Sequence, residues 1–101
     1  MTFDNLIFRP HKSDKISSIA TTVFLDKKNN ICLSVVAGPG FYCNAKEENI
    51  KNPTEDDFSS FEVAIIDESG DEDEYDVRGW QTRKEIDKII KGYDKKEIPT
   101  R

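Results

Sequence analysis

The sequence holds few side chains that could act as a nucleophile, a general base or a metal ligand. His11 is the sole histidine, and Cys32 and Cys43 are the two cysteines. A Cys–His dyad would need a third group to orient the histidine, and no local signature supplies one. Two cysteines and one histidine also fall short of the four ligands of a structural zinc site. We therefore expect a protein that is not an enzyme and that has neither a metal nor a cofactor.

The densest cluster of one chemical type is an acidic run in the second half of the chain. Its seven carboxylates have no basic residue among them: Asp67, Glu68, Asp71, Glu72, Asp73, Glu74 and Asp76. An EF-hand loop aligned on Gly70 would place Ile65 at the first ligand position, so a dedicated calcium site is not expected. Two interpretations stay open. The run is either a solvated hairpin tip or a docking surface that mimics nucleic-acid phosphates toward a basic partner.

Charge is unevenly distributed along the chain. Residues 1–80 carry a net charge of −8 and residues 81–101 a net charge of +3, which together give the −5 of the whole chain. A nucleic-acid-binding domain needs a basic footprint. Direct nucleic-acid binding is therefore not expected, and a protein with a basic surface is the expected partner.

Three aromatic residues fall at the ends of the expected elements, and they form a second candidate site, the aromatic rim: Phe41, Tyr42 and Trp80. One interpretation is that they pack on the rim of the core. The other is that they are exposed anchors for a protein partner, because aromatic residues dominate binding hot spots.

Four expected strands and one helix carry these candidate residues. Alternation of apolar and polar residues predicts strands over 17–25, 31–36 and 58–66. A short fourth strand is expected over 75–77, and Gly79 ends it. Five turn-forming residues between the first two strands predict a hairpin. The expected fold class is α+β, a four-stranded antiparallel β-sheet (a meander) packed by one C-terminal α-helix.

The helix is expected over residues 82–93. Thr82 and Glu85 match a capping box, and Gly92 is a candidate C-terminal cap. An apolar stripe at helical spacing is formed by Ile86, Ile89, Ile90 and Tyr93. The expected core consists of Ile19, Val23, Leu33, Val35, Val63, Ile65, Ile86, Ile89 and Ile90.

At 101 residues the chain has room for one domain, residues 1–101. The parts outside the expected elements are an N-terminal arm over 1–16, a long polar loop over 44–57 and a frayed charged tail over 94–101. No apolar run approaches the roughly 20 residues of a membrane span, and the first ten residues lack a signal-peptide pattern. We expect a cytoplasmic protein with two free thiols.

Three segments occur in a characteristic order. Residues 30–36 end in Ser-Val-Val, residues 61–66 read Phe-Glu-Val-Ala-Ile-Ile, and residues 76–82 lead through Gly-Trp-Gln-Thr into the helix. In this order they resemble a family of small uncharacterised phage and prophage proteins, over residues 19–93. The resemblance implies a sheet-plus-helix domain made in the bacterial cytosol during infection. It implies no known activity, so no functional residue is carried over.

The resemblance and the acidic run together predict a non-enzymatic phage accessory protein that binds and inhibits a host protein with a basic surface. Host defence machinery with a basic nucleic-acid channel, such as a defence nuclease complex, is the leading candidate. The alternative is a structural or assembly protein that acts by self-association. Such a protein would form a homodimer through an exposed sheet edge or through the aromatic rim.

Overall fold

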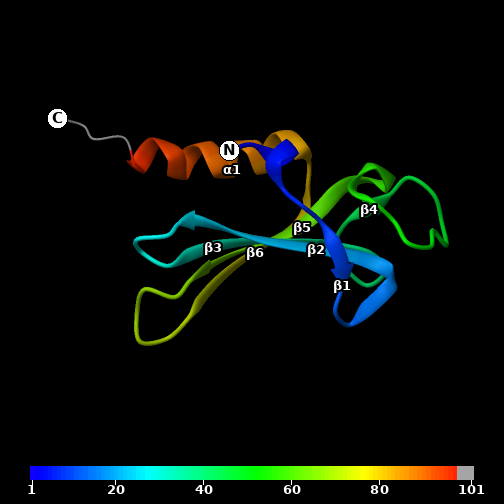
Figure 1. Ribbon diagram of the computed structural model, residues 1–101, viewed down its shortest axis with the longest axis horizontal. Helices are drawn as coiled ribbons and strands as arrows, with labels where there is room; N and C mark the ends of the chain where they lie inside the picture. The colour runs from blue at the N-terminus through cyan, green and yellow to red at the C-terminus, as the bar shows by residue number, and fades with distance from the viewer. Residues whose placement is uncertain (98–101) are drawn as a thin grey trace.

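A computed structural model describes residues 1–97 as an antiparallel sheet with one helix on one face (Figure 1). Two 3-10 turns, η1 (Phe3–Asn5) and η2 (Glu55–Asp57), precede β1 and β5. The strands and the helix are β1 (Arg9–His11), β2 (Asp14–Asp26), β3 (Ile31–Ala37), β4 (Asn44–Ala45), β5 (Phe58–Asp67), β6 (Glu74–Gln81) and α1 (Arg83–Glu97). The α+β class is confirmed. The expected count of four strands is wrong, because the sheet has six.

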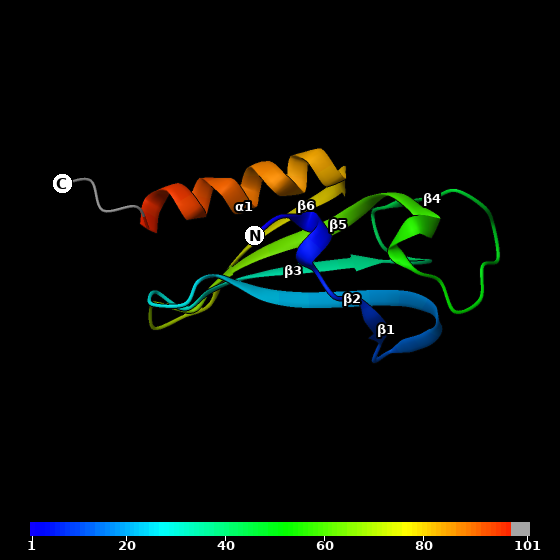
Figure 2. The same cartoon turned by 45° about the horizontal axis from the view of Figure 1, so that its top comes forward.

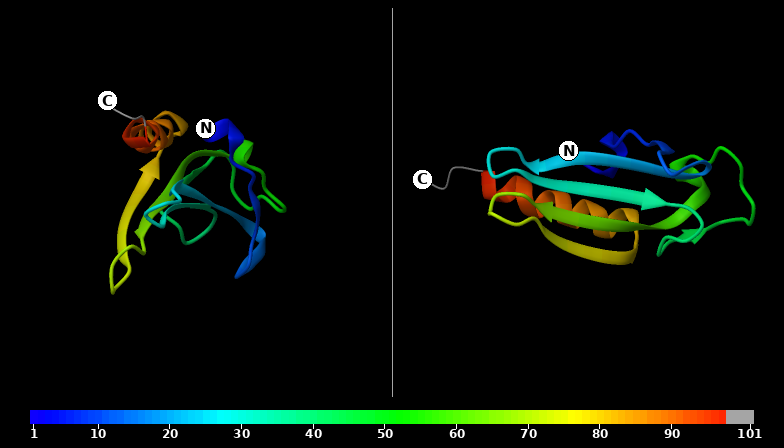
Figure 3. Two further views of the ribbon diagram at one scale, coloured as in Figure 1. Left: turned by 60° about the vertical axis from the view of Figure 1, so that its left-hand side comes forward. Right: turned by 90° about the horizontal axis from the view of Figure 1, so that it is seen from below.

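The strand order is β1-β2-β3-β5-β4, with β6 also paired to β5, and every pair is antiparallel. The four longest strands, β2, β3, β5 and β6, form the expected meander and lie side by side in the right-hand view of Figure 3. The two strands that the sequence did not predict, β1 and β4, have three and two residues. Such lengths are too short to show the alternation from which strands are predicted. β4 and η2 both lie within the expected loop over 44–57.

Strand β5 has two successive neighbours along one edge. Phe58, at its start, lies opposite Ala45 of β4, and residues 61–67 pair with β6. Its other edge pairs with β3, where Val63 lies opposite Val35. β5 therefore fixes the positions of both the β3–β4 connection and β6.

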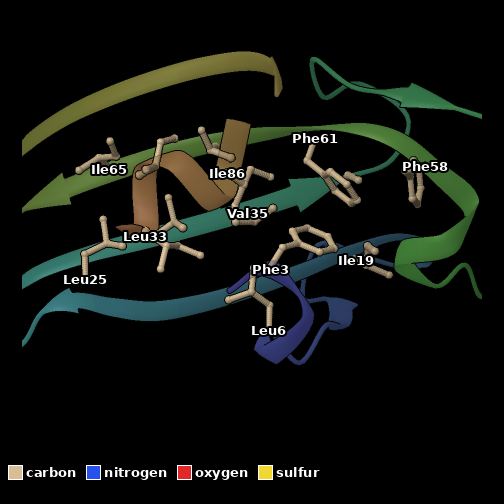
Figure 4. Packing of buried hydrophobic residues seen from close by; sticks show 14 residues of the cluster. Phe3, Leu6, Ile19, Leu25, Leu33, Val35, Phe58, Phe61, Ile65 and Ile86 are labelled. Carbon is tan, nitrogen blue, oxygen red and sulfur yellow. The ribbon is translucent and has the colours of Figure 1, made fainter. Parts of the chain in front are cut away.

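The core lies between the sheet and the layer formed by α1 and the N-terminal segment (Figure 2). Eight of the nine expected core residues are buried, and the ninth, Val23, is half-buried against them. Figure 4 shows buried side chains of β2, β3 and β5 gathered on the face of the sheet that α1 covers, as the alternation in these strands predicts. The core residues that the sequence pattern did not identify are Phe3, Leu6, Leu25, Ala37, Phe58 and Phe61.

Residues 1–16 do not form the expected N-terminal arm. Turn η1 places the ring of Phe3 5.1 Å from that of Phe61 and 5.7 Å from that of Phe8. The backbone N–H of Phe3 donates a hydrogen bond to Asp87 Oδ1 in α1, at 2.6 Å. β1 then pairs with β2. The segment has no periodic pattern, so its aromatic residues are the only local sign that it belongs to the core.

Helix α1 begins as expected and ends later. Glu85 Oε1 accepts from the backbone N–H of Thr82 at 3.0 Å, and the N–H of Glu85 donates to Thr82 Oγ1 at 3.2 Å. The capping box is therefore confirmed. The helix continues through Gly92 to Glu97, so the expected end near Tyr93 is wrong. Residues 94–97 of the expected tail are helical, and residues 98–101 lie outside the described part of the chain.

Replacing Phe3 tests whether the N-terminal segment belongs to the core. We expect Phe3→Ala to lower the free energy of unfolding by about 3–5 kcal/mol, because it empties a packed aromatic site. Phe24→Ala is the matched control, since Phe24 is exposed on the other face of the sheet, and it should cost less than about 1.5 kcal/mol. Urea unfolding measures both. Equal losses for the two variants would show that residues 1–16 are an arm after all.

Candidate functional site

An irregularity in β6 shapes the most distinctive exposed feature of the molecule. The pairing of β5 with β6 shifts between Phe61 and Val63, so Gly79 and Trp80 together lie opposite Glu62. Trp80 has a φ of 52°, a left-handed conformation that a bulky residue rarely adopts. These are the marks of a β-bulge. Gly79 does not end the strand, as the sequence suggested, because β6 continues through the bulge to Gln81.

The bulge presents two aromatic rings side by side. The backbone N–H of Trp80 donates to the carbonyl of Tyr42 at 2.8 Å. The two rings have centroids 5.0 Å apart and planes inclined by 30°. Tyr42 and Trp80 are nevertheless 58% and 54% exposed. We call these two residues the aromatic pair.

Two residues outside the expected aromatic rim hold the aromatic pair in place. Glu62 accepts a hydrogen bond from the backbone N–H of Tyr42 through Oε1, at 3.0 Å. Gly79 leaves room for Tyr42, since a Cβ at position 79 would lie 2.7 Å from Tyr42 Cβ. A glycine inside a strand pattern is a sign of a bulge or of a close approach, and that sign was present at Gly79.

The third residue of the expected aromatic rim points elsewhere. Phe41 is half-buried, and its ring lies 5.2 Å from the imidazole of His11. Its N–H donates to Gly38 O, and its carbonyl accepts from the N–H of Cys43, so the chain turns tightly on both sides of it. The structure therefore brings two of the three expected rim residues together and separates the third.

The seven acidic residues lie on and around the β5–β6 hairpin, which projects from the body of the molecule at lower left in Figure 1. Two of the seven carboxylates bind side chains two positions away in the sequence. Asp67 accepts from the backbone and the hydroxyl of Ser69, and Asp76 pairs with Arg78 at 2.7 Å. Their partners lower the pKa of both carboxyl groups. The exposed carboxylates that remain are Glu68, Asp71, Glu72, Asp73 and Glu74.

The residues with catalytic side chains are not brought into a working arrangement. Cys43 exchanges hydrogen bonds with the backbone of Gly38, and burial raises the pKa of its thiol. His11 Nδ1 instead accepts from the N–H of Ser13. Cys43 lines a cavity of about 500 Å³ together with Phe41, Ile50 and Phe58. A thiol with a raised pKa is a poor nucleophile at neutral pH, so the cavity offers room without an activated group.

Comparisons of the chain with protein-family models, with curated proteins and with solved structures found no match. Within residues 1–97, no group of three or more His, Cys, Asp or Glu side chains is arranged to hold a metal ion. In the same part of the chain, no helix combines the length and the apolar character needed to cross a membrane. Two candidate sites remain. One is the aromatic pair, and the other is the acidic hairpin, by which we mean the β5–β6 hairpin with its exposed carboxylates from Glu68 to Glu74.

Gly79→Ala tests how the aromatic pair is held. The new methyl group would displace Tyr42 and separate the two rings, so we expect a changed emission spectrum from Trp80, the single tryptophan of the chain. Gly92→Ala is the control, because a Cβ there meets no atom within 4 Å. The control should leave the emission unchanged and stabilise the helix by up to about 1 kcal/mol. An unchanged spectrum for Gly79→Ala would contradict the close contact between Gly79 and Tyr42.

Ser69→Ala tests the local hydrogen bonds in the acidic hairpin. The pKa of Asp67 is lowered in the folded protein by Ser69, so this bond stabilises the fold above the ordinary pKa and is lost as pH falls through the folded pKa. The variant should raise the pKa of Asp67 in an NMR titration. It should also destabilise the protein at neutral pH but not in strong acid. Ser59→Ala is the control, since Ser59 donates to the carbonyl of Asn44 and not to a carboxylate.

Proposed function

We propose that this chain is a non-enzymatic protein-binding domain and that the aromatic pair is its anchor. The observation that carries the proposal is the left-handed backbone of Trp80, at φ 52°. Such a conformation costs about 1–3 kcal/mol and persists only where the surroundings impose it. Here it supports a large aromatic ring that is more than half exposed. The bulge accounts for the backbone conformation but does not require an aromatic side chain, so an exposed ring at this position is better explained by binding than by the stability of the fold.

The acidic hairpin supplies the second part of the proposal. Five exposed carboxylates at one end of the molecule attract a basic surface over long range and orient it before contact. Such steering raises the association rate and falls with ionic strength. The partner that fits is a protein with a basic surface around an apolar pocket.

The narrower form of the proposal is a phage accessory protein that inhibits a host protein in the bacterial cytosol. The resemblance of residues 30–36, 61–66 and 76–82 to phage and prophage proteins supports the source. The acidic hairpin supports a target with a basic nucleic-acid channel, such as a defence nuclease complex. The alternative function, assembly by self-association, is favoured by one observation, the open edge of β6.

Trp80→Asn separates binding from folding. Asn adopts left-handed backbone readily, so the free energy of unfolding should stay equal or rise, whereas the anchor is lost. In affinity capture from a bacterial extract, the wild-type chain should retain a basic protein that Trp80→Asn binds at least about 30-fold more weakly. Equal retention by the two chains would rule out the aromatic pair as the anchor.

Two double variants with the same change in net charge test the steering role of the acidic hairpin. Glu72→Gln with Asp73→Asn should slow association with the captured protein and flatten its dependence on salt. Glu47→Gln with Glu48→Gln makes the same change in net charge on the exposed loop before η2 and should have little effect. If both double variants behave alike, the hairpin has no steering role.

A further inference from the structure

Strand β6 has one unpaired edge. It pairs with β5 on one side, and no strand among residues 1–97 pairs with its other side. The right-hand view of Figure 3 shows β6 as the outer border of the sheet. Residues 74–78 are all exposed. An exposed edge strand is a template for pairing with another chain.

The sequence of this edge is complementary to itself. Asp76 and Arg78 lie on one face of β6, opposite Ile65 and Val63 of β5, and Val77 lies between them on the other face. We propose that a second copy of this chain adds its β6 antiparallel to this one, with the two-fold axis at Val77. Asp76 then faces Arg78 of the second copy, and Arg78 faces Asp76 of the second copy.

Other registers lack this match. An axis at Asp76 would set Arg78 opposite Glu74 but would also set two aspartates opposite each other, and an axis at Arg78 would set two arginines opposite each other. Like charges directly opposite destabilise a strand pair. An axis midway between two residues would set a side chain of one face against a side chain of the other, which a continuous sheet does not allow. Only the axis at Val77 pairs opposite charges at both positions.

The four charges would form one closed network. Asp76 Oδ2 already accepts from Arg78 Nη2 at 2.7 Å within one chain, and both side chains are about half exposed. Pairing adds the same contacts across the axis, so each charge has two neighbours of opposite sign. Networks of this kind contribute more than isolated surface pairs.

The other face of the paired strands would bury apolar surface. Tyr75 and Val77 lie opposite Ile66 and Ala64 of β5, and they are 62% and 56% exposed. In the proposed register Val77 meets Val77 of the second copy. Tyr75 points toward the bulge of the second copy, where Tyr42 already occupies the space beside Gly79.

The dimer also brings the two candidate sites together, a consequence that rests on the proposed function. In one chain, Glu74 and Trp80 are separated by six positions of β6, or roughly 20 Å. In the proposed dimer, Glu74 comes beside the bulge of the second copy, which contains Trp80. Each aromatic pair would then have a neighbouring acidic hairpin, and this combination suits a basic side chain of the partner.

Charge reversal tests the register directly. In sedimentation velocity over a range of concentrations, we expect the wild-type chain to dimerise. Asp76→Arg alone gives this face two positive charges and Arg78→Asp alone gives it two negative charges, so each should weaken self-association at least about tenfold. The double variant Asp76→Arg/Arg78→Asp should dimerise as the wild type does. An equal mixture of the two single variants should form a heterodimer.

A single variant could also fail to dimerise because it is unfolded. The equal mixture separates this case from a charge effect, because an unfolded chain would not form the heterodimer. Lys46→Glu with Glu48→Lys swaps charges on an exposed loop and should leave dimerisation unchanged. A wild-type chain that stays monomeric at millimolar concentration overturns the proposal, as do single variants that dimerise normally or a mixture that stays monomeric. These measurements use the protein alone, so their failure is distinct from a failure of partner capture.

Discussion

One strand with two neighbours on the same edge is the constraint that organises this molecule. β5 pairs with β4 at its start and with β6 from Phe61 onward. The change of neighbour occurs between Ser60 and Phe61, and the extra residue of β6 lies just before it, opposite Glu62. The irregular backbone of Trp80 and the position of Tyr42 both follow from this arrangement. The candidate site is therefore a consequence of sheet topology as much as of its own residues.

The same end of β5 connects the layers of the core. The guanidinium of Arg83, in the first turn of α1, lies 5.1 Å from the ring centre of Phe3 and 5.2 Å from that of Phe61. It also donates to the carbonyls of Phe58 and Glu55. A cation over two rings with its N–H groups satisfied by backbone oxygens is a favourable arrangement. It fixes the helix, η2 and the N-terminal segment to one strand.

Local periodicity accounts for what the sequence could predict. The β2–β3 hairpin, the alternation of β5 and the stripe of α1 are all encoded by spacing within one element, and each is confirmed. The burial of Phe3 depends on Phe61 and Arg83. Because both are distant from Phe3 in the sequence, no local pattern predicts its burial. The split of the aromatic rim has a similar cause. Phe41 and Tyr42 are adjacent, yet tight backbone turns send their rings toward different neighbours.

The outer strands β1 and β6 differ in how readily they could pair with another chain, and this difference bears on assembly. β1 has three residues and includes Pro10, which removes a backbone donor and discourages pairing. β6 has eight residues and contains neither proline nor lysine. Antiparallel pairing of two β6 strands would use the open edges of both, and it would leave outside the short strands β1 and β4 and the part of β2 that β1 does not cover. Such an assembly closes at two copies because an isologous contact satisfies itself, and the acidic hairpins at its ends would repel further copies.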